Sequence, residues 1–320
     1  MRPPPLFVLG VRRSGTTLLR VMLDRHSELA VPDESYFIPQ LAGRHRGRID
    51  LDAFADDLRR LPTLRDWGVR ADDARARLTP GATLADGIRA VYELYAEARK
   101  KGRWGDKTPM YMQHLRLLDR LFPDALYVHL VRDGRDAALS FLAVPPGIVT
   151  ETWGHPRSAV GYACQWRSEV LAARALGKRV GPGRYLEVRY EALVRDPEGE
   201  LRRICNFAGL SYEPAMLEYA GAVDLSAKPH QQSLSRPPTP GLRDWRETMA
   251  PGDVAAFERV ADDVLGAYGF ELETRTKPRG PDFRARWVLA SYALRTGAWR
   301  AAGAAVCRSP LWRRRHPPLT

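Results

Sequence analysis

The sequence predicts an α/β fold, a P-loop-like three-layer sandwich with a central parallel sheet, a helical insertion and a C-terminal helical tail. Short apolar runs are each followed by a turn and a helical pattern, which is the order of elements in a parallel sheet. The first such turn, Gly10 to Thr17, has two glycines at the spacing of a phosphate-binding loop. A chain of 320 residues that is 44% hydrophobic is also long enough to bury a substantial core.

The expected elements follow in chain order. Four apolar runs are the expected strands: Leu6 to Leu9, Leu29 to Val31, Leu126 to Val131 and Tyr185 to Val188. Residues 50–101, rich in Ala, Arg, Leu and Asp at helical spacing, predict a helical insertion. Further helices are expected at 111–121, 135–142, 157–176, 196–208 and 251–267. The proline-rich stretch 226–242 predicts an ordered surface loop or lid. We therefore expect one domain over residues 1–275 and an extension over 276–320.

The first loop is expected to hold a nucleotide phosphate. Its glycines let backbone N–H groups approach an anion, its hydroxyl groups are further donors, and the helix that follows adds a partial positive charge. The lysine of an ATP-hydrolysing P-loop would stand where Thr16 stands, and the cations Arg12 and Arg13 lie before the second glycine instead. The candidate phosphate-binding residues are Arg12, Arg13, Ser14, Gly15, Thr16 and Thr17.

A second candidate phosphate site follows the strand that ends at Arg132. A turn at Gly134 and a helix from about Asp136 place Arg132 at the carboxyl edge of the sheet, where α/β proteins bind ligands. Ser140 lies one to two turns into that helix, so a guanidinium and a hydroxyl can bind one phosphate together. The alternative is a set of surface ion pairs around a strand end, which would be favoured for this motif alone. Its pairing with the first loop favours the phosphate site.

These motifs together resemble the sulfotransferases that use 3′-phosphoadenosine 5′-phosphosulfate (PAPS). The resemblance rests on Gly10 to Thr17, on Lys107 in Trp-Gly-Asp-Lys-Thr-Pro, on Arg132 with Ser140, and on Arg189 to Leu193, in this order and spacing. It extends over residues 6 to about 270. The stretch from Arg13 to His26 looks like the tyrosylprotein and related carbohydrate branch, which implies the fold and activity of that branch.

The resemblance implies a position for each part of PAPS and no metal. The first loop is implied to bind the 5′-phosphosulfate, Arg132 and Ser140 the 3′-phosphate, and Tyr190 the adenine side. The segment 241–246 resembles a family loop that closes over the cofactor, with Arg236 or Arg243 adding to the 3′-phosphate site. The alternative, that a tryptophan in this segment only anchors a loop to the body, stays open.

Catalysis requires a general base for the acceptor hydroxyl and fixed cations for the transferring group. Glu34 is the candidate base, because the tyrosylprotein branch carries its catalytic glutamate in the matching segment. Asp33 is the competing carboxylate, and both acids would also suit a helix N-terminus that begins near Tyr36. The residues alone leave these two interpretations even. Arg13 and Lys107 are the candidate cations; the alternative for Lys107 is a solvated lysine in a turn.

The acceptor is expected to be a carbohydrate, lipid-linked or tyrosyl hydroxyl. Tyr36 and Gln40 occupy places where the tyrosylprotein branch has arginines that recognise acidic residues, which favours a sugar or a lipid-linked hydroxyl. The alternative function is a P-loop nucleotide or small-molecule kinase. It is disfavoured because Thr16 replaces the lysine and because Asp133, the nearest Mg²⁺ candidate, lies between Arg132 and Gly134.

Charge and cysteine content set the remaining expectations. With 50 Lys and Arg against 38 Asp and Glu, the net charge is +12, which suits an anionic cofactor or surface. Three widely spaced cysteines predict neither a disulfide framework nor a zinc site. Residues 281–320 read as a basic amphipathic helix with a polybasic end, which predicts peripheral contact with anionic membrane or, alternatively, a helix packed on the domain. We expect a cytoplasmic protein that binds PAPS and a hydroxyl acceptor and binds no nucleic acid.

Overall fold

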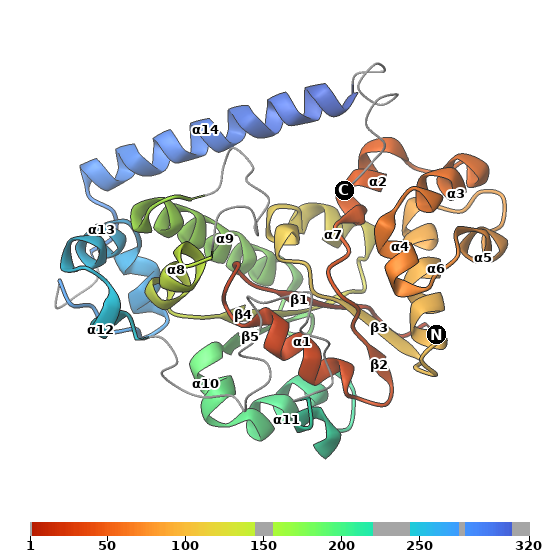
Figure 1. Cartoon of the computed structure of the whole chain (residues 1–320), viewed down its shortest axis with the longest axis horizontal. Helices are drawn as coiled ribbons and strands as arrows, with labels where there is room; N and C mark the ends of the chain where they lie inside the picture. Colours follow the sequence, from red (N-terminus) through yellow and green to blue (C-terminus); the bar gives the residue numbers. More distant parts are fainter. Residues whose placement is uncertain (1, 145–155, 220–243, 275–278, 309–320) are drawn as a thin grey trace.

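The computed structural model describes residues 2–144, 156–219, 244–274 and 279–308, with the backbone alone at 299, 300 and 303–308. A five-stranded parallel sheet lies at its centre in the order β2-β3-β1-β4-β5 (Figure 1). The strands are β1 (Leu6–Leu9), β2 (Leu29–Ala30), β3 (Arg103–Asp106), β4 (Leu126–Val131) and β5 (Tyr185–Arg189). In the register of the central strands, Leu6 lies opposite Gly105 of β3 and Leu126 of β4.

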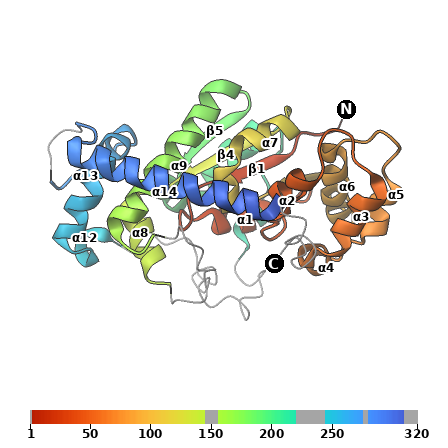
Figure 2. The same ribbon diagram turned by 90° about the horizontal axis from the view of Figure 1, so that it is seen from above.

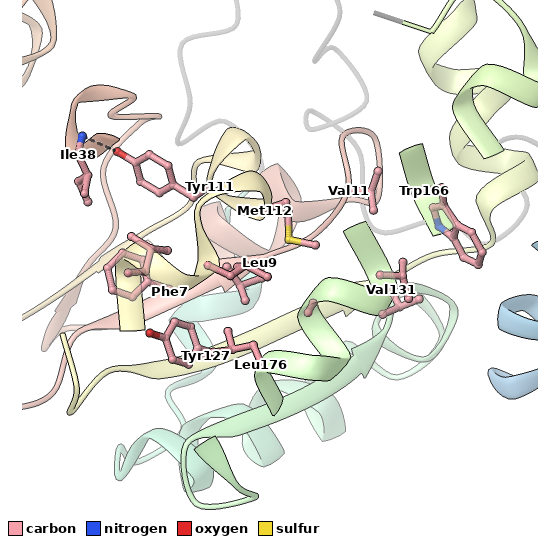
Figure 3. Packing of buried hydrophobic residues seen from close by; sticks show 14 of the residues in the cluster. Phe7, Leu9, Val11, Ile38, Tyr111, Met112, Tyr127, Val131, Trp166 and Leu176 are labelled. Carbon is pink, nitrogen blue, oxygen red and sulfur yellow. Dashed lines mark hydrogen bonds between the residues drawn. The ribbon is translucent and has the colours of Figure 1, made fainter. Parts of the chain in front are cut away.

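Helices cover both faces of this sheet, as the predicted three-layer sandwich requires (Figure 1). One face packs under α1 (Thr16–Asp24), α10 (Tyr190–Arg195) and α11 (Pro197–Ala208). The other is covered by α7 (Leu115–Leu121), α8 (Gly134–Leu142), α9 (Ala159–Val180) and α13 (Pro251–Ala267). Side chains of a strand alternate between faces, so Leu6 and Val8 join the first core while Phe7 and Leu9 join the second. Figure 3 shows the second core, in which Phe7 stacks on Tyr127 of the neighbouring strand.

The helical insertion is present, and one central strand was missed. Residues 50–101 hold α3 (Leu51–Arg59), α4 (Pro62–Trp67), α5 (Ala71–Ala76) and α6 (Leu84–Glu97), and α2 (Phe37–Arg44) precedes them. The strand β3 escaped prediction because Arg-Trp-Gly-Asp has no β-branched residue. Its glycine is required by packing: a Cβ on Gly105 would lie 2.7 Å from the carbonyl oxygen of Leu6.

The expected helix over 111–121 is divided in two. A 3₁₀ turn, η1 (Pro109–Gln113), comes first, and α7 begins only at Leu115. The phenol of Tyr111 accepts the N–H of Ile38 from α2 at 3.2 Å (Figure 3), so this turn serves a contact with another element. Tertiary contact thus overrides the local helical pattern here.

After η2 (Pro214–Leu217) and α12 (Trp245–Thr248), the chain ends in the long helix α14 (Phe283–Arg308). This helix packs against α9 and α13 and runs across the molecule toward α2 (Figures 1 and 2). In the described part of the chain, no helix is both long and apolar enough to span a bilayer. The division at residue 275 stays a prediction.

Candidate active site

The phosphate loop joins β1 to α1 in a conformation that its glycines permit. Gly15 has φ of 87°, and a Cβ there would lie 2.4 Å from the ring of Tyr190. At Gly10 an added Cβ would lie 2.9 Å from a carbonyl oxygen of β4. Arg13 also has a positive φ, 71°, which costs a non-glycine residue roughly 1 to 2 kcal/mol. The loop is therefore packed tightly against β4 and α10, and it leads directly into the first residue of α1, Thr16.

The second predicted phosphate site lies directly beside the first. Arg13 donates from Nε to Ser140 Oγ at 3.0 Å, which joins the first loop to α8. Arg132 donates from Nη1 to the carbonyl of Arg13 at 3.3 Å, and its guanidinium lies 4.6 Å from the ring centroid of Tyr190. The structure thus brings together residues from β1, β4, α8 and α10 that are far apart in the sequence.

Two buried polar atoms in this region suggest a bound anion. Ser14 Oγ and Arg132 Nε have no hydrogen-bond partner among the described residues, and an unsatisfied buried polar group costs about 1 to 3 kcal/mol. Both atoms can donate, as a phosphate requires. Arg12 is held by its carbonyl, which accepts from the phenol of Tyr162, and Thr16 begins α1 with a buried side chain. These residues fit a nucleotide with phosphates at two positions.

Lys107 and Glu34 form an ion pair next to the phosphate loop. Lys107 is only 2% exposed, so it is not a solvated lysine in a turn. Its Nζ donates to Glu34 Oε1 at 2.5 Å and to Thr17 Oγ1 at 3.2 Å. Burial lowers the pKa of Lys107, and the negative charge of Glu34 opposes that effect. One ammonium group thus bridges the candidate base and the phosphate loop.

The neighbouring acid, Asp33, faces a different cation. It pairs with Arg20 Nη2 at 3.0 Å, and Arg20 also donates to the carbonyl of Val31. The residue at the N-cap of α2 is Tyr36, and it makes no side-chain capping bond. The interpretation of Asp33 and Glu34 as helix caps is therefore wrong: each carboxylate is bound by a cation of its own.

A buried polar cluster that sequence reasoning missed lies behind Glu34. Ser35 donates from Oγ to Asp106 Oδ2 at 2.8 Å and from its N–H to Thr108 Oγ1 at 3.0 Å. The phenols of Tyr92 and Tyr111 lie 2.6 Å from Asp106 Oδ2 and Ser35 Oγ respectively. Burial raises the pKa of Asp106 to about 6. Asp106 stands directly before Lys107 in the sequence. An acidic residue next to the candidate cation was the signal that could have pointed to this cluster.

The segment around Arg132 contains a buried network of ion pairs. The alternative interpretation, a set of surface ion pairs around a strand end, is therefore wrong about their exposure. Arg135 is completely buried and donates to Asp133 and, at 2.6 Å, to Glu258 of α13. The backbone N–H of Trp245 donates to Asp136 Oδ1 at 2.9 Å. The centroid of the Trp245 ring lies 3.7 Å from the guanidinium carbon of Arg135. Trp245 therefore does anchor its segment to the body.

Two predicted residues, Arg236 and Arg243, lie outside the described residues, and so does the whole of the predicted loop or lid at 226–242. Among the residues that the structure does describe, no group of three or more His, Cys, Asp or Glu side chains is arranged to hold a metal ion. The described site therefore consists of a phosphate loop, an arginine and a serine beside it, and a lysine–glutamate pair. Chemically, it can bind an anionic nucleotide, neutralise negative charge with fixed cations and accept a proton on a carboxylate.

Comparison with known proteins identifies the family of this chain. A family model described as "Sulfotransferase family" matches residues 4–214, which is more than half of the chain. The nodulation protein NoeE of Sinorhizobium fredii is 33% identical over 293 residues, covering 84% of this chain and 67% of the relative. Protein-tyrosine sulfotransferase 2 of Gallus gallus is 28% identical, covering 73% of this chain and 57% of the relative. The chain thus spans from just over half to about two thirds of the length of these two proteins.

Two solved structures have a similar fold. The sulfotransferase domain of the Synechococcus PCC 7002 olefin synthase is 27% identical, with a TM-score of 0.54, and the match covers 85% of this chain and 98% of that domain. The sulfotransferase domain of the curacin biosynthetic pathway has a TM-score of 0.60 at 22% identity, covering 85% of this chain and 99% of that domain.

Proposed function

The chain belongs to the sulfotransferase family, and we propose that it transfers the sulfuryl group of PAPS to an acceptor hydroxyl through the site around Glu34. The observation that carries this proposal is the position of Lys107, which contacts both Glu34 and Thr17 of the phosphate loop. The phosphate loop and the carboxylate of Glu34 therefore contact the same ammonium group. Such proximity is what transfer from a bound donor to an activated hydroxyl requires.

The nucleotide binds through two adjacent groups of residues. The loop from Arg12 to Thr17 holds the 5′-phosphosulfate, and Arg132 with Ser140 holds the 3′-phosphate. The hydrogen bond from Arg13 to Ser140 keeps the two sites at a fixed separation, and the unpartnered Nε of Arg132 is a donor that a phosphate satisfies. Tyr190 packs beside Gly15 and contributes to the adenine side. Arg236 or Arg243 adds to the 3′-phosphate site.

In the reaction, PAPS supplies the sulfuryl group that the acceptor oxygen attacks. Glu34 accepts the proton of the acceptor hydroxyl, while Arg13 and Lys107 stabilise the negative charge that develops on the oxygens around sulfur. Because these cations are held by Ser140 and Glu34 before the reaction begins, little reorganisation is needed. Side chains provide all of these roles.

The acceptor that fits the described surface carries several hydroxyl groups. Tyr36, at the N-cap of α2, is 40% exposed beside Glu34, and Gln40 lies in the first turn of that helix. Gln40 Oε1 is buried and has no partner among the described residues, so it can accept a hydrogen bond from a sugar hydroxyl. An aromatic ring and an amide acceptor suit a carbohydrate or lipid-linked sugar better than an acidic peptide.

Contact with an anionic membrane is the finer part of this proposal. Phe283, Trp287 and Leu294 lie on one face of α14 and are 84%, 69% and 75% exposed. Arg284 and Arg295 are exposed on the same helix. The opposite face packs on the body, so apolar residues occupy two faces, not the single face that a simple amphipathic helix has. An exposed apolar stripe beside arginines suits the surface of an anionic bilayer.

Binding of PAP, the nucleotide product, in comparison with AMP tests the proposed function. PAP, which carries the 3′-phosphate, is expected to bind far more tightly than AMP. Arg132→Ala is expected to remove most of that difference, because Arg132 is the cation that we assign to the 3′-phosphate. Calorimetric titration with PAP, AMP and ATP measures this. Arg202→Ala, on the exposed surface of α11, is the matched control. Equal affinity of the wild type for PAP and AMP would contradict the proposal, and a preference for ATP would favour the kinase.

A further inference from the structure

Tyr36 has a backbone conformation that its residue type disfavours. Its φ is 56°, in the left-handed region, although it carries a large side chain. Such a conformation persists only where the surroundings impose it, and it is concentrated at functional sites. Tyr36 is also 40% exposed, so burial of its ring does not explain why it is held there.

The two neighbours of Tyr36 impose this conformation. Ser35 is 1% exposed and is fixed by Asp106 and Tyr111, while Phe37 is 1% exposed and packs against Trp67. The N–H of Phe37 donates to the carbonyl of Ser35 at 2.7 Å, which closes a tight turn around Tyr36. Because both flanking residues are anchored inside, the side chain of Tyr36 stays outside, next to Glu34.

The phenol of Tyr36 uses one oxygen of the catalytic carboxylate. Tyr36 donates its O–H to Glu34 Oε2, and Lys107 donates to Glu34 Oε1. Both oxygens are therefore occupied. The bond from Tyr36 is of the same kind as the bond that an acceptor hydroxyl must make before it gives up its proton.

We infer that Tyr36 is a removable cap on the general base, which holds the place of the acceptor hydroxyl until an acceptor displaces it. This inference rests on the proposed function, because it takes Glu34 as the base. Its consequence concerns water. While the phenol is bound to Oε2, it competes with water for that oxygen, so consumption of donor without acceptor is slowed.

The reaction that the cap suppresses is hydrolysis of PAPS. A water oxygen forms a bond to sulfur, the bond between sulfur and the 5′-phosphate oxygen breaks, and PAP leaves with the electron pair. One water proton passes to Glu34 and then to solvent, and the other leaves with the sulfur as hydrogen sulfate, which gives it up to solvent. The products are PAP, sulfate and two protons. Water is the only co-reactant.

Removal of the phenol hydroxyl tests the cap. We expect Tyr36→Phe to release PAP from PAPS, with no acceptor present, at least about fivefold faster than the wild type, the factor of one net hydrogen bond. Tyr36→Leu serves as a second variant that lacks the hydroxyl, and Tyr212→Phe, on the far surface near α11, is the matched control. The double variant Tyr36→Phe/Glu34→Gln should lose the increase. Unchanged hydrolysis in both single variants, or sulfation of Tyr36 itself on intact protein, would overturn the cap.

A binding measurement without PAPS provides an independent readout. Tyr36→Ala leaves a gap of one phenol beside Glu34, so p-cresol should bind this variant and not the wild type, as observed by ligand-detected NMR. Tyr212→Ala should bind none. If Tyr36→Ala binds no p-cresol, the ring does not occupy an acceptor position. Failure of the proposed function is distinguished separately, since wild-type protein would then bind PAP no more tightly than AMP.

Discussion

Asp33 and Glu34 are adjacent in the sequence, yet they are bound by different cations, Arg20 and Lys107. Only Glu34 is joined through its cation to the phosphate loop. Removal of the two carboxylates one at a time should therefore have very different effects on turnover.

We expect Glu34→Gln to lower kcat by roughly 10²- to 10⁴-fold, the range for loss of a general base, while PAP affinity stays nearly unchanged. Asp33→Asn should retain most of the activity, because Asp33 is paired with Arg20, whereas Lys107 donates to Glu34. Steady-state kinetics with labelled PAPS measure both variants. If Asp33→Asn is inactive and Glu34→Gln is active, the base is Asp33 and not Glu34. If both variants are active, the base is a different residue.

Asp106 gives the protein a pH dependence of stability with an unusual sign. Its pKa is raised from 3.8 to about 6, since burial penalises the charged form. The folded state therefore holds this proton more tightly than the unfolded state does, and the stability from the group is lost as pH rises from about 4 to about 6. The loss is on the order of 3 kcal/mol. In Asp106→Asn this decrease should be shallower, as measured by urea unfolding at several pH values.

The matched control for that measurement is Asp66→Asn, whose carboxylate is exposed. It should reproduce the wild-type slope between pH 4 and pH 6. An identical slope in wild type and Asp106→Asn would show that Asp106 is already ionised in the folded protein.

At the scale of single residues, sequence reasoning named Lys107 and Glu34 and missed the buried residues behind them, Ser35, Asp106 and Tyr111. Lys107 and Glu34 stand in recognisable motifs. Ser35 and Tyr111 are common residues in unremarkable positions, and their role becomes visible only when β3 brings their segments together. A hydrogen-bond partner 76 residues away in the chain leaves no local signal.

At the scale of elements, strands with apolar runs were predicted and β3 was not. Its neighbour β1 is Leu-Phe-Val-Leu, a run that predicts a buried strand. Strand β3 is Arg-Trp-Gly-Asp, and it ends at Asp106, which belongs to the buried polar cluster behind Glu34. The strand is kept in the sheet by close approach to β1, since Gly105 lies against the backbone of Leu6. Local composition does not report such a contact.

Substitution within β3 checks this account. Gly105→Ala places a methyl group 2.7 Å from a backbone oxygen, so strand β1 must move, and we expect a loss of about 1 to 3 kcal/mol of unfolding free energy. Gly102→Ala, just before the strand, meets no atom within 4 Å and should change stability by less than about 0.5 kcal/mol. Denaturant unfolding of the two variants decides. Equal stability of both would mean that β1 and β3 are not packed this closely.

At the scale of the whole molecule, the predicted α/β sandwich and the predicted sulfotransferase class are confirmed. The expected helix after residue 280 is also present, and it packs on the domain, as one of the two interpretations of this segment had it. Ala285 and Leu289 face the body while Trp287 and Leu294 face outward, so the sequence pattern of one apolar face was misleading.

Vesicle sedimentation checks the outward face of α14. Full-length protein should sediment with phosphatidylserine vesicles at low salt, and less at moderate salt, because each arginine near the surface contributes about 1 kcal/mol. Trp287→Ser/Leu294→Ser should weaken this binding at unchanged net charge. Leu217→Ser, an exposed leucine in η2, is the control. If the double variant and the wild type sediment alike, the stripe does not contact lipid.

The position of β1 in the sheet has a consequence for biosynthesis. This strand is synthesised well before both of its hydrogen-bonded neighbours, β3 from Arg103 and β4 from Leu126. Until then the nascent chain carries an apolar strand with two unpaired edges, the kind of segment that chaperones bind. The loop that follows it gains Ser140 and Tyr190 later still. A nascent chain therefore acquires its nucleotide site only after synthesis has passed Tyr190, well after the phosphate loop itself.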